Sequence, residues 1–190
     1  GVLAIVESSQ GSWAKGDDLF RQALALDPED PDVLNRYGTV LGRTGRLKDS
    51  LVMREKLRTL NTGDLGDEVV TAYYMISAGR RADALAILNG LSTDGFFTNA
   101  NRAWIKAGEG HFVEAADTLL AISPSLQRSP EVQHSIEDSI GLLRSAPEKV
   151  KSPKSLPDLE RGLTWVYGFV GAPERMLDVP ERMLDIDRVS

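Results

Sequence analysis

The sequence predicts an all-α protein made of antiparallel helix hairpins, and three regularities in its 190 residues support this fold class. Apolar residues recur at the three- and four-residue intervals of an amphipathic helix along most of the chain. Glycines recur at a fixed spacing, because Gly11, Gly45 and Gly79 lie 34 residues apart and Gly110 follows 31 residues later. A small residue stands seven positions before each glycine and another stands shortly after it. A period of this length indicates one supersecondary unit that is repeated along the chain.

The first predicted hairpin lacks the start of its first helix. Its apolar opening, GVLAIV, is interpreted as part of that helix, because it is too short for a membrane span or a complete signal peptide. The second helix follows Gly11 and ends with Leu26, directly before Asp27 and Pro28. Proline and aspartate at this point are typical of a helix boundary.

The second hairpin begins at Pro31 and has the most complete pattern, although glycines interrupt it at a cost of roughly 1 kcal/mol each inside a helix. Gly38 is expected to meet Ser50 where the two helices cross, because only short side chains allow a close approach. Gly45 lies between the helices, where a left-handed backbone is cheap only for glycine. Neither role explains Gly42. Either another backbone or a ligand approaches it closely, or the glycine is merely tolerated.

The third and fourth hairpins repeat this pattern more loosely. The third runs from Leu65 through the turn at Gly79, and the fourth runs from about Phe96 through the turn at Gly110. The expected crossing positions again hold small residues, which are Ala72 and Ala84 in the third hairpin and Ala103 and Ala115 in the fourth.

These units resemble the tetratricopeptide repeat, a 34-residue pair of antiparallel helices, in a bacterial type of domain. In the second unit the positions that are large in the family hold Leu34, Tyr37, Leu41 and Leu47, and the small positions hold Gly38 and Ser50. The resemblance implies four hairpins over residues 1–123, with the first one truncated at its start. It also implies that they stack into a right-handed α-α superhelix, a solenoid with a concave face.

Residues 124–190 are predicted to form a degenerate helical segment that packs on the array and caps its end. Residues 129–146 have Ser129 as an N-cap, Pro130 at the first helical position and an apolar stripe at helical spacing. A loop rich in proline and lysine follows over residues 147–157.

A further hairpin is expected beyond this loop. Its first helix covers residues 156–170, Gly171 makes the turn, and Pro173 suits an early position of the second helix. Pro180 falls inside that second helix and should kink or split it. A separate domain is the alternative interpretation of the whole segment from residue 124 onward.

The composition limits the classes of partner. A formal net charge of −6 argues against a general nucleic-acid binder, whose binding face would be basic. No apolar run approaches the roughly 20 residues of a membrane span, so membrane insertion is not expected. The chain has no cysteine, which excludes disulfides, thiolate metal ligands and a cysteine nucleophile. A cytoplasmic location is the expectation.

No catalytic site, metal site or cofactor is predicted. His111 follows a turn glycine at a usually exposed position, and His134 lies four residues before Asp138 on a helix. Two ligands without a third make a poor metal site, so a solvated pair is the preferred interpretation. The repeat period accounts for the glycines, and no phosphate-binding or nucleophile motif occurs. We therefore expect the chain not to be an enzyme.

The resemblance implies that the first helix of each hairpin lines the concave face. The family's groove positions, carried onto this sequence, give a partner-binding set for an unknown protein or peptide: Asn35, Thr39, Arg43, Val69, Tyr73, Ile76, Phe97 and Trp104. Aromatic members would anchor a peptide, and Asn35 and Arg43 would bond its polar groups. In an alternative of equal weight, Trp104 and Phe97 pack against the next helix or the C-terminal segment. Some members of the family bind the terminal carboxylates of a peptide with Lys, Asn and Arg at groove positions of three successive units. The equivalent positions of this sequence do not hold that set of residues.

The leading hypothesis is a non-enzymatic protein-protein interaction module. The alternative is a regulatory or sensory region of a larger bacterial signalling enzyme or transcription regulator. That alternative is motivated by the segment LTWVYGFVGAPERML, which is similar to tetratricopeptide regions attached to nucleotide cyclases and winged-helix regulators. A third hypothesis, self-association into a homo-oligomer, rests on Met176, Leu177, Met183 and Leu184.

Overall fold

Every regular element in the described part of the computed structural model is a helix, which confirms the all-α prediction. The structure describes residues 4, 12–60, 63–91, 95–122, 129–147, 153–160 and 162–176. The chain divides into two compact units, Gly1–Leu91 and Ser92–Ser190. The predicted helix before Gly11 lies outside the described residues apart from Ala4, which is buried.

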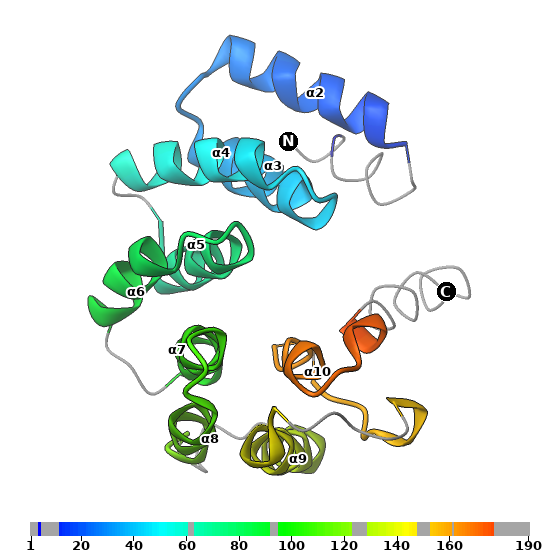
Figure 1. The fold of residues 1–190 in the computed structure, drawn as a ribbon. Coiled ribbons are helices and arrows are strands. Elements are labelled where there is room, and N and C mark those ends of the chain that lie inside the picture. Colours follow the sequence, from blue (N-terminus) through cyan, green and yellow to red (C-terminus); the bar gives the residue numbers. More distant parts are fainter. Residues whose placement is uncertain are drawn as a thin grey trace. The chain divides into compact units, whose positions relative to one another are not determined.

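The first unit is a run of consecutive helices that pack in pairs (Figure 1). In chain order they are α2 (Trp13–Leu26), α3 (Pro31–Arg43), α4 (Leu47–Thr59), α5 (Leu65–Ser77) and α6 (Arg81–Asn89). Helix α3 packs on α4 and α5 packs on α6, while α2 contacts α3 and α4 contacts α5. Phe20 of α2 and Tyr37 of α3 stack in a shared core, with ring centroids 4.8 Å apart.

The α3–α4 hairpin crosses at the two small residues that the sequence predicts. Ser50 Oγ donates a hydrogen bond of 2.6 Å to the carbonyl oxygen of Gly38, and both residues are buried. One turn further along α4, Arg54 Nη2 lies 3.4 Å from the carbonyl oxygen of Asn35, which comes earlier in α3. Because later residues of α4 meet earlier residues of α3, the two helices are antiparallel.

The turn glycines adopt the left-handed conformation that the sequence predicts. Their φ angles are 80° at Gly45, 80° at Gly79, 86° at Gly110 and 80° at Gly171. In the first of these turns the N–H of Arg46 donates to the carbonyl oxygen of Leu41 at 2.9 Å. This bond belongs to the Schellman motif, which satisfies the last carbonyl groups of a helix. The fixed glycine period therefore follows from the repeated need for a positive φ.

Two arginines that follow turn glycines tie neighbouring helices of the first unit together. Each contacts one carboxylate three residues ahead on its own helix and a second one on an earlier helix. The pairs are Arg46 with Asp49 at 2.8 Å and Asp17 at 2.6 Å, and Arg80 with Asp83 at 2.7 Å and Glu55 at 2.6 Å. Exposed ion pairs contribute about 0–1 kcal/mol each, so their main effect is to favour one register between the helices.

The second unit begins with a hairpin and continues into a less regular segment. Its elements are α7 (Phe96–Gly108), α8 (Phe112–Leu120), α9 (Pro130–Ser145), η2 (Pro153–Ser155), α10 (Val166–Phe169) and η3 (Pro173–Met176). Helix α8 packs on both α7 and α9, and α10 contacts α9. Helix α9 begins as the sequence predicts, because Pro130 is its first residue and Ser129 Oγ accepts a bond of 3.4 Å from the N–H of Val132.

The structure differs from the sequence prediction over residues 156–170, which do not form one helix. Only Val166–Phe169 is α-helical there, while residues 157–160 have no regular structure and residues 162–165 form a turn. The described part of the expected second helix is the 3-10 helix η3, which begins at Pro173. The predicted kink at Pro180 lies outside the described residues.

Side chains supply several hydrogen bonds of this irregular segment in addition to those of its backbone turns. Tyr167 Oη accepts from the N–H of Leu159 at 2.9 Å and donates to the carbonyl oxygen of Pro157 at 2.6 Å. Arg175 pairs with Asp158 at 2.7 Å and lies over the Tyr167 ring, 5.1 Å from its centroid. The apolar periodicity of the sequence did not reveal these bonds, because they depend on side chains that meet only in the folded segment.

Candidate interaction site

The predicted partner-binding residues are divided between the two units. Helix α3 carries Asn35, Thr39 and Arg43, α5 carries Val69, Tyr73 and Ile76, and α7 carries Phe97 and Trp104. Arg43, Tyr73 and Phe97 are exposed, Ile76 is buried, and the other members are half-buried. The set is therefore not a uniform exposed surface.

Asn35 and Thr39 contribute to a buried cluster around Arg54 of α4. The Arg54 side chain is only 1% exposed. Its Nη2 donates to Thr39 Oγ1 and lies 3.4 Å from the carbonyl oxygen of Asn35, while Nη1 lies 3.3 Å from Asp67 Oδ1. The guanidinium carbon is also 6.0 Å from the centroid of the Tyr74 ring. We call these five residues the Arg54 cluster.

Burial dominates the electrostatics of the Arg54 cluster. Desolvation lowers the pKa of Arg54, and the nearby Asp67 carboxylate opposes that shift. Arg54 Nε is buried without a hydrogen-bond partner among the described residues, and it lies against Gly38. Because an incompletely bonded buried charge is costly, we interpret the cluster as a device that specifies which helices pack together.

Gly42, which the hairpin pattern leaves unexplained, packs against the ring of Tyr74 on α5. A Cβ atom at Gly42 would lie 2.3 Å from Tyr74 Cζ, so only glycine fits without moving the ring. Tyr74 is buried, and its hydroxyl donates to the carbonyl oxygen of Thr39 at 3.3 Å. The close approach at Gly42 is therefore made by a side chain of the next hairpin.

Arg43 and Tyr73 are the exposed members of the predicted set in the first unit. Tyr73 keeps 43% of its surface exposed and meets Tyr74 edge to ring, with centroids 5.4 Å apart. Arg43 forms no ion pair with any residue that the structure describes. Ile76 is only 5% exposed, so its side chain does not contribute to the surface of the described chain.

The two predicted aromatic residues of α7 pack within the second unit. Trp104 stacks on Trp165, with centroids 6.1 Å apart and planes 10° from parallel, and Trp165 meets the ring of Phe169. A Cβ atom at Gly162 would lie 3.0 Å from Phe97 Cε1, so this ring lies against the backbone of the C-terminal segment. Trp104 therefore packs on its own chain, whereas Phe97 contacts the same segment and stays 47% exposed.

The residues behind the self-association hypothesis are only partly described. Met176 is half-buried and packs against the core of the second unit. Leu177, Met183 and Leu184 lie outside the described residues. The one described member is therefore engaged within its own unit.

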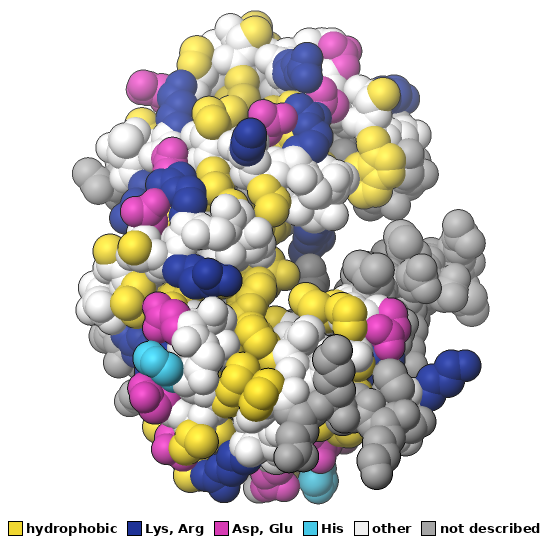
Figure 2. All heavy atoms as spheres, in the orientation of Figure 1, with side chains coloured by type: hydrophobic (Ala, Val, Ile, Leu, Met, Phe, Trp, Pro, Cys, Tyr) yellow, Lys and Arg dark blue, Asp and Glu magenta, His cyan; other side chains and the backbone are white. Residues whose placement is uncertain are grey.

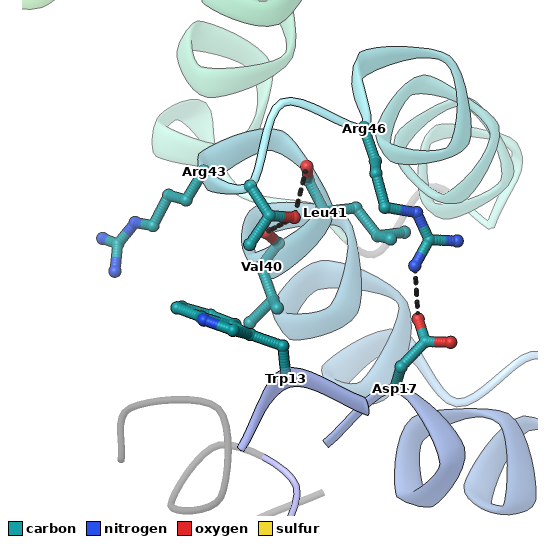
Figure 3. A pocket seen from close by; sticks show the side chains of 7 residues that line it. Trp13, Asp17, Val40, Leu41, Arg43 and Arg46 are labelled. Atoms are coloured by element: carbon teal, nitrogen blue, oxygen red, sulfur yellow. Dashed lines mark hydrogen bonds and ion pairs between the residues drawn. The ribbon is translucent and has the colours of Figure 1, made fainter. Parts of the chain in front are cut away.

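The first unit holds a pocket of about 460 Å³ between α2 and the end of α3 (Figure 3). It is lined by Trp13, Asp17, Val40, Leu41, Arg43, Thr44 and Arg46, and we call it the Trp13 pocket. The Trp13 side chain is 49% exposed, whereas Leu41 is buried. Figure 3 shows the Arg43 and Arg46 side chains extending on opposite sides of Val40.

Asp17 and Arg46 hold each other on one side of the Trp13 pocket. Burial acts to raise the pKa of Asp17, but hydrogen bonds from Tyr37 and Arg46 outweigh it, so the pKa lies below its ordinary value. The pKa of Arg46 is raised, first by its hydrogen bond to Asp49 and then by that to Asp17. Both groups are therefore charged at neutral pH, and their charges are directed at each other.

A second hollow of about 600 Å³ lies beside α2, α3 and α4. Leu24, Val52 and Met53 supply much of its apolar lining. Arg21 and Arg46 also line it, and each is paired with the carboxylate of Asp17. This hollow therefore presents an apolar surface, and the positive charges of Arg21 and Arg46 at its edge are balanced by ion pairs within the protein.

Sequence reasoning missed Trp13 and Arg54. No local signal marks Trp13 as exposed. Trp13 lies two residues after Gly11, and the equivalent residue two positions after Gly45 is Leu47, which is half-buried. Arg54 did carry a signal. It lies four residues after Ser50 and three before Leu57, which places it on the inner face of the predicted helix.

The described residues offer few groups that could bind a metal ion. Among them, no three His, Cys, Asp or Glu residues lie close enough together to hold one. His111 is exposed, with its Nδ1 4.0 Å from Glu114 Oε1, and His134 is exposed on α9.

On the face shown in Figure 2, basic and acidic side chains are interspersed.

None of the described helices combines the length and the apolar composition that crossing a membrane would require.

No protein-family model matches this chain and no curated protein matches it significantly, so a functional assignment rests on the packing and the surface of the two units.

Proposed function

We propose that the protein is a non-enzymatic interaction module that binds a peptide or protein partner through exposed residues on the first helices of its hairpins. The observation that carries this proposal is the arrangement of adjacent residues on α3 and α5. Gly42 and Tyr74 interlock, while their neighbours Arg43 and Tyr73 are exposed. The interlock holds the exposed side chains on a well-packed framework. Tyrosine and arginine are among the residues most enriched at binding hot spots.

The proposal includes membership of the tetratricopeptide class, with hairpins that continue into a right-handed superhelix. The support is the recurring turn, with a φ of 80° at both Gly45 and Gly79, together with the Gly38–Ser50 crossing. In an array of this class the first helices line a concave face. Tyr73 would then share that face with Arg43.

Selection from a phage-displayed random peptide library against the immobilised full chain tests this function. We expect a family of related peptides to be enriched and to bind the purified chain in fluorescence anisotropy. Tyr73→Ala should weaken that binding by about fivefold or more, because truncation of a hot-spot residue costs more than about 1 kcal/mol.

Leu85→Ala is the matched control for this variant. Leu85 is an exposed apolar residue on α6, the second helix of the same hairpin, and it is 37% exposed. Both variants should keep the circular dichroism spectrum of the wild type. A selection that enriches no peptide contradicts the interaction function, and equal losses in the two variants contradict the assignment to the first helix.

A further inference from the structure

We infer that the Trp13 pocket binds an acidic peptide segment that carries an apolar anchor residue, an inference that rests on the proposed interaction function. The pocket offers an apolar surface to such an anchor. Trp13 is 49% exposed there, and Val40 beside it is half-buried. An aromatic or aliphatic side chain placed against the indole would remove much of this apolar surface from water.

The charge of the Trp13 pocket favours an acidic ligand. Its lining includes two guanidinium groups and one carboxylate. Arg46 is held by Asp17 and Asp49, whereas Arg43 has no ion-pair partner in the described part of the chain. Arg43 is therefore available to form a two-pronged hydrogen bond to a carboxylate, which a guanidinium geometry suits better than an ammonium.

The other polar groups of the pocket are already bonded within the protein. The Thr44 hydroxyl lies 2.9 Å from the carbonyl oxygen of Val40 and 3.1 Å from that of Leu41, and it donates to them. Selectivity for the ligand therefore depends on two features, which are the Trp13 indole and the charge of Arg43.

A nucleic acid is a poorer fit than a peptide, although its bases could also stack on a tryptophan. Phosphate backbones are bound by several cations that act together. This pocket has a single uncommitted arginine, and its lining also includes the carboxylate of Asp17, in a chain whose net charge is −6. These charges would repel a polyanion more than they repel a short acidic segment.

Three labelled peptides test the inference by fluorescence anisotropy with the full chain. The first alternates glutamate with phenylalanine, the second replaces each glutamate by lysine, and the third replaces each phenylalanine by serine. The first should bind at least about tenfold more tightly than either of the others, since a charge mismatch or the loss of an apolar anchor each costs about 1.4 kcal/mol or more. An acidic peptide that does not bind, or that binds no better than the lysine peptide, overturns the inference.

Pocket variants then locate the site. Arg43→Ala should weaken binding of the acidic peptide by about fivefold, and Trp13→Ala should weaken it by about tenfold. Arg43→Glu should reverse the preference in favour of the lysine peptide. Arg36→Ala is the matched control, because Arg36 is an exposed arginine of the same helix that does not line the pocket. This variant should bind the acidic peptide with an affinity within about twofold of the wild type.

The outcomes separate this inference from the proposed function. Equal effects of Arg36→Ala and Arg43→Ala indicate non-specific attraction and overturn the pocket assignment. Tighter binding of a labelled single-stranded oligonucleotide than of the acidic peptide also overturns it. If library-selected peptides bind but ignore substitutions at Trp13 and Arg43, the interaction function stands and only the pocket assignment fails.

Discussion

The two units of the chain build similar hairpins and fill the space beside the first helices in different ways. In the first unit a polar cluster that joins α3, α4 and α5 centres on the buried guanidinium of Arg54. In the second unit Trp104 of α7 stacks on Trp165 from an irregular segment later in the chain. The repeat period thus determines the hairpins, while residues outside the period determine which surfaces stay open.

This difference has a consequence for binding. In the first unit the internal contacts are made by Gly42 and Tyr74, so the adjacent Arg43 and Tyr73 are exposed. In the second unit the corresponding aromatic residue, Trp104, packs against its own C-terminal segment. We therefore expect substitutions of exposed residues in the first unit to affect binding and substitutions in the aromatic stack to affect folding.

The largest expected effect is that of Trp165→Ala. Trp165 is 3% exposed and packs between Trp104 and Phe169, so its loss should lower the free energy of unfolding by about 3–5 kcal/mol. Urea titration followed by circular dichroism measures the change. Trp13→Ala is the control and should cost clearly less, about 1–2 kcal/mol, because 49% of Trp13 is already exposed. If the two variants lost similar free energies of unfolding, the proposed difference between the two units would be wrong.

Substitutions of Arg54 should show how the polar cluster of the first unit acts. Arg54→Ala leaves Asp67 and Thr39 without their partner and should destabilise the chain by about 3 kcal/mol. Arg54→Met leaves the same two partners unpaired but fills much of the lost volume, so it should be less destabilising than Arg54→Ala by about 1 kcal/mol. The same urea titration distinguishes the variants. A Met variant as unstable as the Ala variant would show that the hydrogen bonds, and not the packing, hold the hairpins together.

A pair of helix glycines should respond to alanine with opposite signs. Gly42→Ala places a Cβ atom 2.3 Å from Tyr74 Cζ, and the resulting overpacking should cost a net of about 1 kcal/mol. Gly141→Ala on α9 meets nothing within 4 Å and should stabilise the chain by up to about 1 kcal/mol, because alanine favours helix. Equal shifts in the urea midpoint would show that the Tyr74 ring yields without cost. In the double variant with Tyr74→Ala, the penalty at Gly42 should be much smaller.

Local physical requirements made much of the fold predictable from the sequence. A positive φ requires glycine, which revealed the turns at Gly45 and Gly79, and close helix crossing requires small residues, which revealed Gly38 and Ser50. The start of α9 was predictable because Ser129 caps it. Each of these features depends on residues whose conformational preference is visible within a few positions.

The unpredicted features depend on distant partners. The Tyr74 ring reaches Gly42 on another hairpin, and no local pattern reports such a contact. The segment before Gly171 has apolar spacing typical of a helix, yet the hydroxyl of Tyr167 bonds backbone groups at Pro157 and Leu159. The groove positions that the tetratricopeptide resemblance implies include the exposed residues Arg43 and Tyr73, but they also include Ile76, whose burial the resemblance did not reveal. A binding role for these positions stays a prediction.

The contact between Gly42 and Tyr74 also makes the hairpins of the first unit non-interchangeable. The residue equivalent to Gly42 in the next hairpin, 34 positions later, is Ile76, and the residue of α7 equivalent to Tyr74, 31 positions later, is Ile105. If the α5–α6 hairpin were duplicated in tandem, the second copy of Tyr74 would face an isoleucine side chain instead of bare backbone. The order of the hairpins is thus encoded at their junction, and lengthening the array by duplication or shuffling would require a compensating substitution at this pair of positions.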